Sequence, residues 1–303
     1  MTKEVAEAMA IRTPHRLLSC HGAYIKAGHT WLADVLKNPN AKTENTILLD
    51  SGAFTAWNQG HVMELKELMP VYYDFMSKYW SSVKDVWLIN LDKIPGSPGR
   101  TADQAEIDDC IRISDENYNL LVREFGPRVL PVYHQGESKD RLLELSNIAE
   151  YICISPRNDL HENFRVAWSR EAHAALPMGK RTHGLAATGV SMMTTVPWGS
   201  VDSAAWVFKA GTGVIILTIN GKMIDLGVSE QSPSRFIEGR HVMNLNSAMK
   251  KVVEDRIESL GFTVAELAES HSARTDIIMR EVQYWVANHH YCGFSKPPSL
   301  FDL

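Results

Sequence analysis

The sequence predicts an α/β fold, and more specifically a (β/α)8 barrel. Short apolar segments rich in strand-forming residues recur along the 303 residues, and stretches with helical spacing separate them. Continuous apolar strands that alternate with amphipathic helices are typical of a parallel sheet covered by helices. About eight such units in one stretch favour a barrel over a doubly wound sheet.

The predicted elements follow one another in a regular order. Strands are expected at residues 16–25, 46–54, 85–94, 129–136, 151–156, 181–187 and 200–206, with 213–219 as an eighth candidate. Helices are expected between them at residues 62–80, 101–125, 139–149 and 163–176. Residues 214–226 contain an Asn-Gly turn between two apolar runs, which predicts a β-hairpin inserted in the barrel.

The chain after residue 239 is predicted to be helical. Gly261 marks a helix stop, and Thr263 with Glu266 has the spacing of a capping box. We expect helices that close the barrel here, although this region also faintly resembles a helix-turn-helix. The sequence shows no internal repeat or linker, so residues 1–303 are expected to form one domain, with 240–303 as its C-terminal helical part.

Composition restricts the class of protein. The chain is 45% hydrophobic and 22% charged, as is ordinary for globular proteins. It has no apolar run of the roughly 18 residues that a membrane span needs. The N-terminus contains acidic residues and lacks the apolar core of a signal peptide, so we expect a cytoplasmic protein. The net charge of −5 argues against a surface coated with nucleic-acid-binding charge, but not against a local basic groove.

The cysteines lie far apart, without a close pair, at Cys20, Cys110, Cys153 and Cys292. We expect reduced and mostly buried thiols. A zinc site made mainly from them is not expected, because such ligands usually come in close pairs. His289, His290 and Cys292 stand close together in the sequence, and a metal site there is left open as a minor alternative.

Polar residues stand where several predicted strands end. Asp50 follows the apolar run ILL, Asp92 follows VWLINL, Gln135 and Gly136 follow VLPVYH, and Asp202 lies within GSVDSAAW. A single Asp in such a place is more commonly a turn residue. The strands of a barrel, however, end at one shared rim, where active sites lie. Three acids and an amide on that rim therefore predict one site.

These residue types limit the chemistry of the predicted site. The sequence has no H-x-H or H-E-x-x-H motif, no triad-like arrangement, no P-loop and no complete dinucleotide fingerprint. Carboxylates without a metal suit glycosyl transfer, in which one attacks an anomeric carbon and another gives and takes a proton. A third carboxylate with an amide suits hydrogen bonding to a base edge such as that of guanine. We expect neither a metal nor a cofactor.

Three segments resemble motifs of the tRNA-guanine transglycosylases. DSGAF (50–54) is similar to their DSGGF-type signature, and YHQGES (133–138) is similar to their Gln-Gly segment. Residues 199–226 are similar to the stretch that holds the nucleophilic Asp, a loop and a β-hairpin. These segments follow the family's order and roughly its spacing across residues 45–226. The resemblance implies base exchange between a nucleic acid and a free base on a (β/α)8 barrel.

The resemblance also implies roles for the matched residues. Asp202 would be the nucleophile that attacks C1′ of a guanosine nucleotide and expels guanine. Asp50 would be the general acid/base. Asp92 and Gln135 would hold the Watson–Crick edge of the base, with Gly136 close by.

The remaining residues of the DSGAF segment would contribute to base binding. Ser51, Gly52 and Phe54 follow Asp50 directly, so the resemblance places them beside the base. Phe54 or Trp57 would stack on the base, or these rings would only pack against the protein.

The sequence departs from the family at several points. Ala53 replaces the second Gly of the signature, Ser155-Pro156 replaces a Gly-Gly pair whose backbone contacts the base, and residues 203–205 lack the Phe-Asp-Cys run. Pro156 has no N–H to offer to a base. The cysteine- and histidine-rich zinc subdomain is missing. This reduced pattern resembles the phage- and island-encoded DNA 7-deazaguanine transglycosylases.

That second resemblance implies exchange of guanine in DNA for a 7-deazaguanine such as 7-cyano-7-deazaguanine, as a modification that protects phage genomes from restriction. The expected partners are DNA and the free 7-deazaguanine base, in the host cytoplasm if the chain is phage-encoded; a homodimer is left open. Three alternatives remain: the same exchange on tRNA, a non-catalytic barrel subunit that binds nucleic acid, and hydrolysis of the glycosidic bond without replacement.

Overall fold

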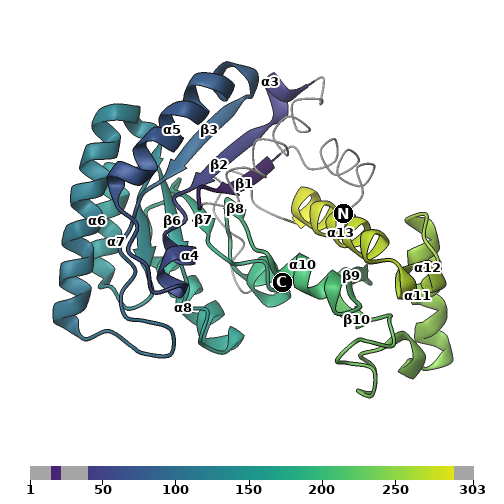
Figure 1. Cartoon of the computed structure of the whole chain (residues 1–303). Helices are drawn as coiled ribbons and strands as arrows, with labels where there is room; N and C mark the ends of the chain where they lie inside the picture. The colour runs from purple at the N-terminus through teal and green to yellow at the C-terminus, as the bar shows by residue number, and fades with distance from the viewer. Residues whose placement is uncertain (1–14, 22–39, 290–303) are drawn as a thin grey trace. The chain divides into compact units, whose positions relative to one another are not determined.

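The computed structural model describes residues 15–21 and 40–289, whose elements are drawn in Figure 1. The chain divides into two compact units. The described residues of 14–187 and 191–202 form the first, called the sheet unit here, and those of 188–190 and 203–290 form the second, the hairpin unit. The single domain expected over residues 1–303 stays a prediction.

The sheet unit contains parallel strands that are neighbours in the order of the chain. Their bounds are β1 (His15–Ser19), β2 (Thr46–Asp50), β3 (Asp85–Ile89), β4 (Val129–Leu130), β5 (Val132–His134), β6 (Tyr151–Ser155), β7 (Arg181–Gly184) and β8 (Ser200–Val201). They form two four-stranded sheets, β1-β2-β3-β4 and β5-β6-β7-β8. The strands predicted from 16–25 to 200–206 are thus confirmed, with shorter bounds; residues 22–25 lie outside the described residues.

Pro131 divides one predicted strand, 129–136, into β4 and β5. Proline has no N–H to donate to a neighbouring strand. Its carbonyl oxygen still accepts a hydrogen bond from Cys153 N at 2.9 Å, and Leu130 O accepts one from Asn90 N at 2.9 Å. Residues 129–134 therefore border both sheets, with β4 paired to β3 and β5 paired to β6.

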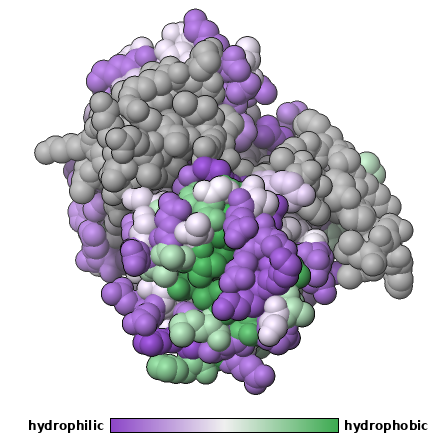
Figure 2. Space-filling model, turned by 90° about the vertical axis from the view of Figure 1, so that its right-hand side faces the viewer, coloured by the Kyte–Doolittle hydropathy of each residue, from purple (hydrophilic) through white to green (hydrophobic). Residues whose placement is uncertain are grey.

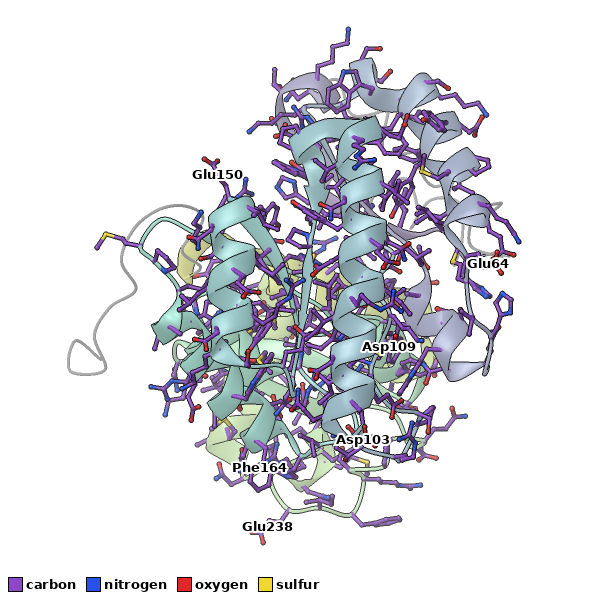
Figure 3. All side chains as sticks on the ribbon, turned by 90° about the vertical axis from the view of Figure 1, so that its left-hand side faces the viewer. Glu64, Asp103, Asp109, Glu150, Phe164 and Glu238 are labelled. Atoms are coloured by element: carbon purple, nitrogen blue, oxygen red, sulfur yellow. The ribbon has the colours of Figure 1, made fainter. Side chains whose placement is uncertain are left out.

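Helices alternate with these strands, and the helices expected from the sequence are confirmed with small shifts at their ends. The expected helices are α5 (Leu65–Tyr79), α6 (Gln104–Phe125), α7 (Lys139–Ile148) and α8 (Glu162–Ala175). The sheet unit also contains the short helices α3 (Ala41–Glu44), α4 (Ala53–Asn58) and α9 (Val190–Thr195), which were not predicted. Side chains before α6, α7 and α8 cap free N–H groups of these helices. Asp103, labelled with Glu64 in Figure 3, accepts a hydrogen bond from Glu106 N at 2.9 Å, and Ser138 accepts one from Arg141 N at 3.2 Å.

The two faces of the parallel strands carry different side chains, because successive residues of a strand point to opposite sides. Leu49 packs in one apolar cluster with Tyr72 of α5, whereas Leu48 packs in another with Cys153 of β6. Asp50 follows Leu48 by two residues, so its carboxyl group is directed to the face of Leu48 and Cys153.

The structure establishes an α/β fold with parallel strands and helices in alternation. Within the described ranges, no pairing joins β8 to β1, so closure into a barrel is not seen there. Residues 213–219, the eighth candidate strand, do not join the parallel strands. They contain β9 (Val214–Ile219), which pairs antiparallel with β10 (Lys222–Gly227).

The hairpin unit confirms the predicted hairpin at 214–226. Ile219 pairs with Lys222 across a two-residue turn of Asn220 and Gly221, whose φ angles are 49° and 73°. Positive φ at both central residues defines the type I′ turn, which an Asn-Gly pair adopts readily. This local signal is why the hairpin was readable from the sequence.

The other elements of the hairpin unit are α10 (Ala205–Gly211), a 3-10 turn (Val242–Asn244), α11 (Ser247–Ser259), α12 (Val264–Glu269) and α13 (His271–His289). Thr263 caps α12 by accepting a hydrogen bond from Glu266 N at 3.1 Å, as the capping-box spacing predicts. We expected these helices to close the barrel. In the structure, α11 and α13 pack against β9 of their own unit; closure of a barrel by these helices stays a prediction.

Buried charged groups connect the elements of the hairpin unit. Glu281 of α13 is fully buried and binds Arg256 of α11 and the backbone N–H of Thr218 in β9. Arg274 is also buried, and its guanidinium donates to Ala210 O at 2.6 Å and Leu267 O at 2.8 Å. Ala210 lies in the last turn of α10, and Leu267 lies in the last turn of α12. Arg274 therefore binds carbonyl oxygens that have no partner within their own helix.

The surface mixes polar and apolar residues. Figure 2 shows an apolar area bordered by hydrophilic residues on the face drawn there. Phe208, Phe236 and Met243 are among the most exposed large apolar side chains of the hairpin unit. Among the described helices, none combines the length and apolar character required to cross a bilayer.

Candidate active site

Asp50 ends β2, and the backbone after it turns sharply into α4. Gly52 has a φ of 84°, and its N–H donates to Asp50 Oδ2 at 3.2 Å. A Cβ atom on Gly52 would lie 3.0 Å from both N and Cβ of His21. Glycine is therefore required at position 52 by conformation and by space, and the resulting turn fixes the Asp50 carboxyl group.

Asp92 lies in the loop after β3, and hydrogen bonds hold this loop on α6. Asn90 Nδ2 donates to Ser114 O at 2.9 Å, and Lys93 N donates to Ser114 Oγ at 2.9 Å. Asn117 Nδ2 donates to Leu91 O at 2.7 Å. The backbone on both sides of Asp92 is thereby fixed, which places its carboxyl group at the carboxyl end of the strands.

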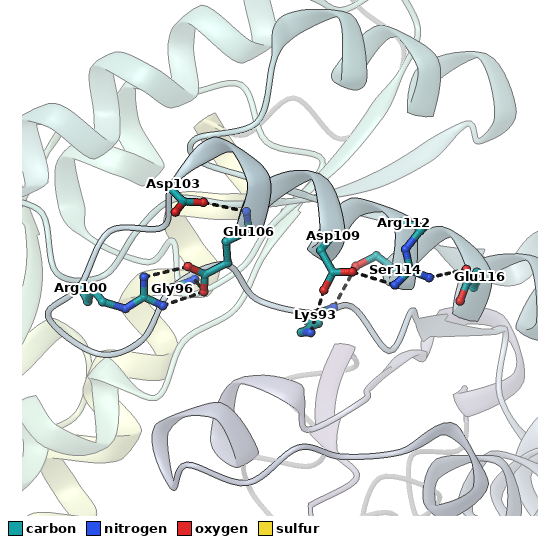
Figure 4. Close-up of polar contacts among 9 residues, drawn as sticks. All are labelled: Lys93, Gly96, Arg100, Asp103, Glu106, Asp109, Arg112, Ser114 and Glu116. Carbon is teal, nitrogen blue, oxygen red and sulfur yellow. Dashed lines mark hydrogen bonds and ion pairs between the residues drawn. The ribbon is translucent and has the colours of Figure 1, made fainter.

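The same loop is held further along by ion pairs, as Figure 4 shows. Lys93 Nζ lies 3.2 Å from Asp109 Oδ2. Arg100 binds both carboxylate oxygens of Glu106 at 2.7 Å, and Glu106 Oε1 also accepts a hydrogen bond from Gly96 N at 3.1 Å. Bidentate contacts of this kind fix geometry better than single ones.

Asp92 forms a buried pair with His134, the last residue of β5. Asp92 Oδ2 lies 2.7 Å from His134 Nε2, and the side chains are only 7% and 8% exposed, respectively. Burial alone lowers the pKa of His134. The hydrogen bond to Asp92 and the charges of Asp92 and Glu137 outweigh this effect, so the pKa of His134 is raised above its ordinary value.

Gln135 follows His134, and the backbone of the next strand exit fixes its amide. Arg157 N donates to Gln135 Oε1 at 3.0 Å. Since the oxygen must face this donor, the NH2 group of Gln135 remains as the donor available to a ligand. Pro156 itself offers no N–H, and the neighbouring N–H of Arg157 is used for Gln135. Gly136 adopts a φ of 120°, which favours glycine.

Asp202 follows β8, and two donors hold one of its oxygens. His183 Nε2 lies 3.2 Å from Asp202 Oδ1, and Ala186 N donates to the same oxygen at 3.2 Å. The Asp202 side chain is 24% exposed. Within the described residues no hydrogen bond is found to Oδ2, so this oxygen is the one available for chemistry.

The three predicted carboxylates stand at the carboxyl ends of parallel strands. Asp50 ends β2, Asp92 follows the neighbouring β3, and Asp202 follows β8. Burial, followed by the charges of Asp202 and Asp92, raises the pKa of Asp50 to about 7. Burial, followed by the charges of Asp92, Asp202 and Asp50, raises the pKa of the Cys153 thiol in β6. The three carboxylates are therefore close enough for their charges to act on these groups.

The other DSGAF residues differ in their availability to a ligand. Ser51 is completely buried, and its hydroxyl accepts a hydrogen bond from Ala53 N at 3.3 Å, which makes it a turn residue. Phe54 is 46% exposed and stacks on Trp57, with ring centroids 5.9 Å apart. Trp57 Nε1 donates to Gly96 O at 3.0 Å. Trp57 is thus tied to the protein, whereas Phe54 has an exposed surface for a base.

Two histidines that bind carboxylates of the candidate site were not selected from the sequence. His134 stands directly before Gln135 within the YHQGES segment, and His183 lies in the predicted strand 181–187, but neither was given a role. Glu137 was also missed: burial raises its pKa to about 7, against the opposing charges of His134 and Arg141. A histidine at a predicted strand end beside an acidic rim is the signal that would have found His134.

The prediction of buried thiols is confirmed for three of the four cysteines. Cys20, Cys110 and Cys153 are buried free thiols. The described side chains contain no cluster of three or more potential metal ligands. His290 and Cys292 lie outside the described residues, as does the side chain of His289, so the minor alternative of a metal site there stays a prediction.

Comparison with models of known protein families and with curated proteins gives no match to this chain. The chemistry of the site therefore rests on its own geometry. It combines a carboxylate with a free oxygen at Asp202, a carboxyl group that exchanges a proton near neutral pH at Asp50, and polar groups at Asp92 and Gln135 fixed by their neighbours.

Proposed function

We propose that this chain is a transglycosylase that exchanges guanine in DNA for a free 7-deazaguanine base, such as 7-cyano-7-deazaguanine. The observation that supports the proposal is that Asp50, Asp92 and Asp202 all stand at the carboxyl ends of parallel strands, where their charges act on Asp50 and on Cys153. A double displacement needs a nucleophile and an acid/base at one anomeric carbon, and these residue types meet that need.

In the first displacement, Asp202 Oδ2 attacks C1′ of the nucleotide. A C1′–O bond forms, the C1′–N9 bond to guanine breaks, and the departing guanine takes a proton from Asp50. A pKa of about 7 keeps much of the Asp50 population protonated near neutral pH, which is the range in which general acids are most effective.

In the second displacement, the incoming base gives a proton to Asp50 and its nitrogen bonds to C1′. The bond between C1′ and Asp202 breaks, which restores both carboxyl groups to their starting states. The two inversions retain the configuration at C1′. One glycosidic bond replaces another, so the exchange needs no nucleotide cofactor.

Base recognition is assigned to Asp92 and Gln135. Asp92 is held by His134 and accepts hydrogen bonds from the N–H groups of a guanine-like edge. The NH2 group of Gln135 donates to the carbonyl oxygen of that edge, because Arg157 N occupies Gln135 Oε1. Phe54 supplies an exposed ring on which the base stacks, with a typical contribution of about 1–3 kcal/mol.

We also propose that the fold is a (β/α)8-type barrel built from the parallel strands β1 to β8. DNA is the proposed polymer because the reduced sequence pattern resembles the DNA enzymes. The target nucleotide must leave the base stack or be single-stranded for Asp202 to reach C1′, at a cost of a few kcal/mol.

The test is to incubate the protein with single- and double-stranded DNA and free 7-cyano-7-deazaguanine, digest to nucleosides, and analyse them by mass spectrometry. The deazaguanine nucleoside is expected in DNA with wild-type protein and not with Asp202→Ala. A parallel reaction with tRNA identifies the polymer, and alkaline cleavage of the DNA detects hydrolysis without replacement. Binding of nucleic acid with no exchange on either polymer would contradict the proposal and favour a non-catalytic barrel.

A further inference from the structure

A chain of hydrogen bonds runs through the parallel strands to Asp202. Tyr151 at the start of β6 contacts Ser200 Oγ at the start of β8. Ser200 Oγ lies 2.6 Å from Nδ1 of His183, and Nε2 of His183 lies 3.2 Å from Asp202 Oδ1. His183 is only 2% exposed. This series of hydrogen bonds therefore links the amino ends of β6 and β8 to the carboxylate of Asp202, which follows the carboxyl end of β8.

The partners define the direction of each bond. An ionised carboxylate only accepts hydrogen bonds, so Nε2 of His183 carries a proton and donates it to Asp202. In a neutral imidazole Nδ1 then accepts, and the Ser200 hydroxyl is its donor. The Tyr151 hydroxyl in turn donates to Ser200. Every group in this arrangement has a suitable partner, as a buried polar chain requires.

We propose that His183, oriented by Ser200 and Tyr151, is a positioning residue that holds Oδ1 of Asp202 and leaves Oδ2 as the atom that bonds to C1′; this inference rests on the proposed transglycosylase function. Ala186 N donates to the same oxygen at 3.2 Å, so two donors fix the carboxylate plane. They also stabilise the charge that returns to Asp202 when the glycosyl bond breaks.

His173, another histidine of the sheet unit, does not bind a carboxylate as His183 does. His173 is engaged at both ring nitrogens, by Ser169 O at 2.6 Å and Thr182 Oγ1 at 2.8 Å, and it contacts no carboxylate of the site. His173 therefore offers a matched control for the loss of a hydrogen-bonded histidine. Its removal changes packing without changing the position of Asp202.

The experiment measures steady-state base exchange for His183→Phe, His183→Gln, Ser200→Ala and His173→Gln, with thermal unfolding of each protein. We expect His183→Phe to lower kcat about 100-fold with little change in KM, since a displaced reacting group costs about this much. His183→Gln keeps an N–H donor and is expected to recover most of the loss. Ser200→Ala is expected to lower kcat less than His183→Phe, and His173→Gln to leave it within about threefold.

A second measurement does not depend on activity. In protein with 15N-labelled histidine, the NMR signals of His183 are expected to show a proton on Nε2, and this proton signal is expected to shift in Asp202→Ala. Protonation of His183 at Nδ1 alone, or a folded His183→Phe protein with wild-type kcat, would overturn the inference while the proposed function stands. A wild-type protein with the expected NMR signals but no base exchange would overturn the proposed function and the positioning role with it.

Discussion

His134 Nε2 lies 2.7 Å from Asp92 Oδ2 in a nearly water-free environment, so the two side chains form one buried ionisable unit. Removal of one partner leaves the other as an uncompensated buried polar group, which typically costs about 3–5 kcal/mol when the group is charged. The pair therefore contributes to the stability of the sheet unit and holds the carboxylate that we propose binds the base.

The first prediction concerns this pair and its pH dependence. His134→Leu is expected to lower the free energy of unfolding by about 3 kcal/mol and to raise KM for the incoming base. The pKa of His134 is raised in the folded state, so the stabilisation is complete below the unfolded-state value of about 6.5 and is lost as the pH rises through the folded-state value. Denaturant unfolding at pH 6 and pH 9 checks this; an effect that grows with pH would contradict it.

The second prediction concerns the stability cost of Asp50. Its pKa is raised to about 7 from 3.8, so the folded state binds the proton more tightly and stability falls as the pH rises from about 4 to 7. Asp50→Asn removes the charge and is expected to stabilise the protein above pH 7, on the order of 2 kcal/mol, while base exchange is lost. Thermal unfolding at pH 4.5 and pH 8 should show a larger gain at pH 8. An equal gain at both values would count against the raised pKa.

The third prediction concerns the rate of exchange. If protonated Asp50 assists the departure of guanine, kcat/KM for DNA is expected to fall about tenfold per pH unit above pH 7. The profile is measured with wild-type protein over pH 5.5–9. A rate that stays constant across the pKa of about 7 would remove Asp50 from the role of general acid.

The fourth prediction separates Phe54 from Trp57. Phe54→Ala removes an exposed stacking surface and is expected to raise KM for the free base about tenfold, consistent with a stacking contribution of about 1–3 kcal/mol per base, with little effect on unfolding. Trp57→Phe loses the hydrogen bond to Gly96 O and is expected to lower stability with a smaller effect on KM. Steady-state kinetics and thermal unfolding of both variants give the comparison; the reverse pattern would assign stacking to Trp57.

The sequence predicted the strands, the four helices between them and the hairpin because these depend on local patterns. Apolar segments that alternate with helical patterns, the Thr263 cap and the Asn220-Gly221 turn are all readable within a few residues. Asp50, Asp92, Gln135 and Asp202 were found because they follow apolar strands, whose carboxyl ends share one rim.

The contacts between distant segments could not be read in this way. The pairing of Asp92 with His134 and of Asp202 with His183 depends on the register of neighbouring strands, which no single segment reveals. The burial of Ser51 could likewise not be read from the sequence, and its contact with the base stays a prediction. Residues 213–219 have the composition of a buried parallel strand, which is why they were also an eighth candidate strand; the Asn220-Gly221 turn and the pairing with β10 identify them as a hairpin strand.

The central claim is tested most directly by trapping the covalent intermediate. The protein is mixed with target DNA in the absence of a free base and then denatured, and any DNA adduct is mapped to a peptide by mass spectrometry. A covalent deoxyribose adduct on Asp202, absent from the Asp202→Asn protein, is the predicted result. An adduct on Asp50 or Asp92 would contradict the assignment of Asp202 as the nucleophile. Base exchange by the Asp202→Asn protein would contradict it as well.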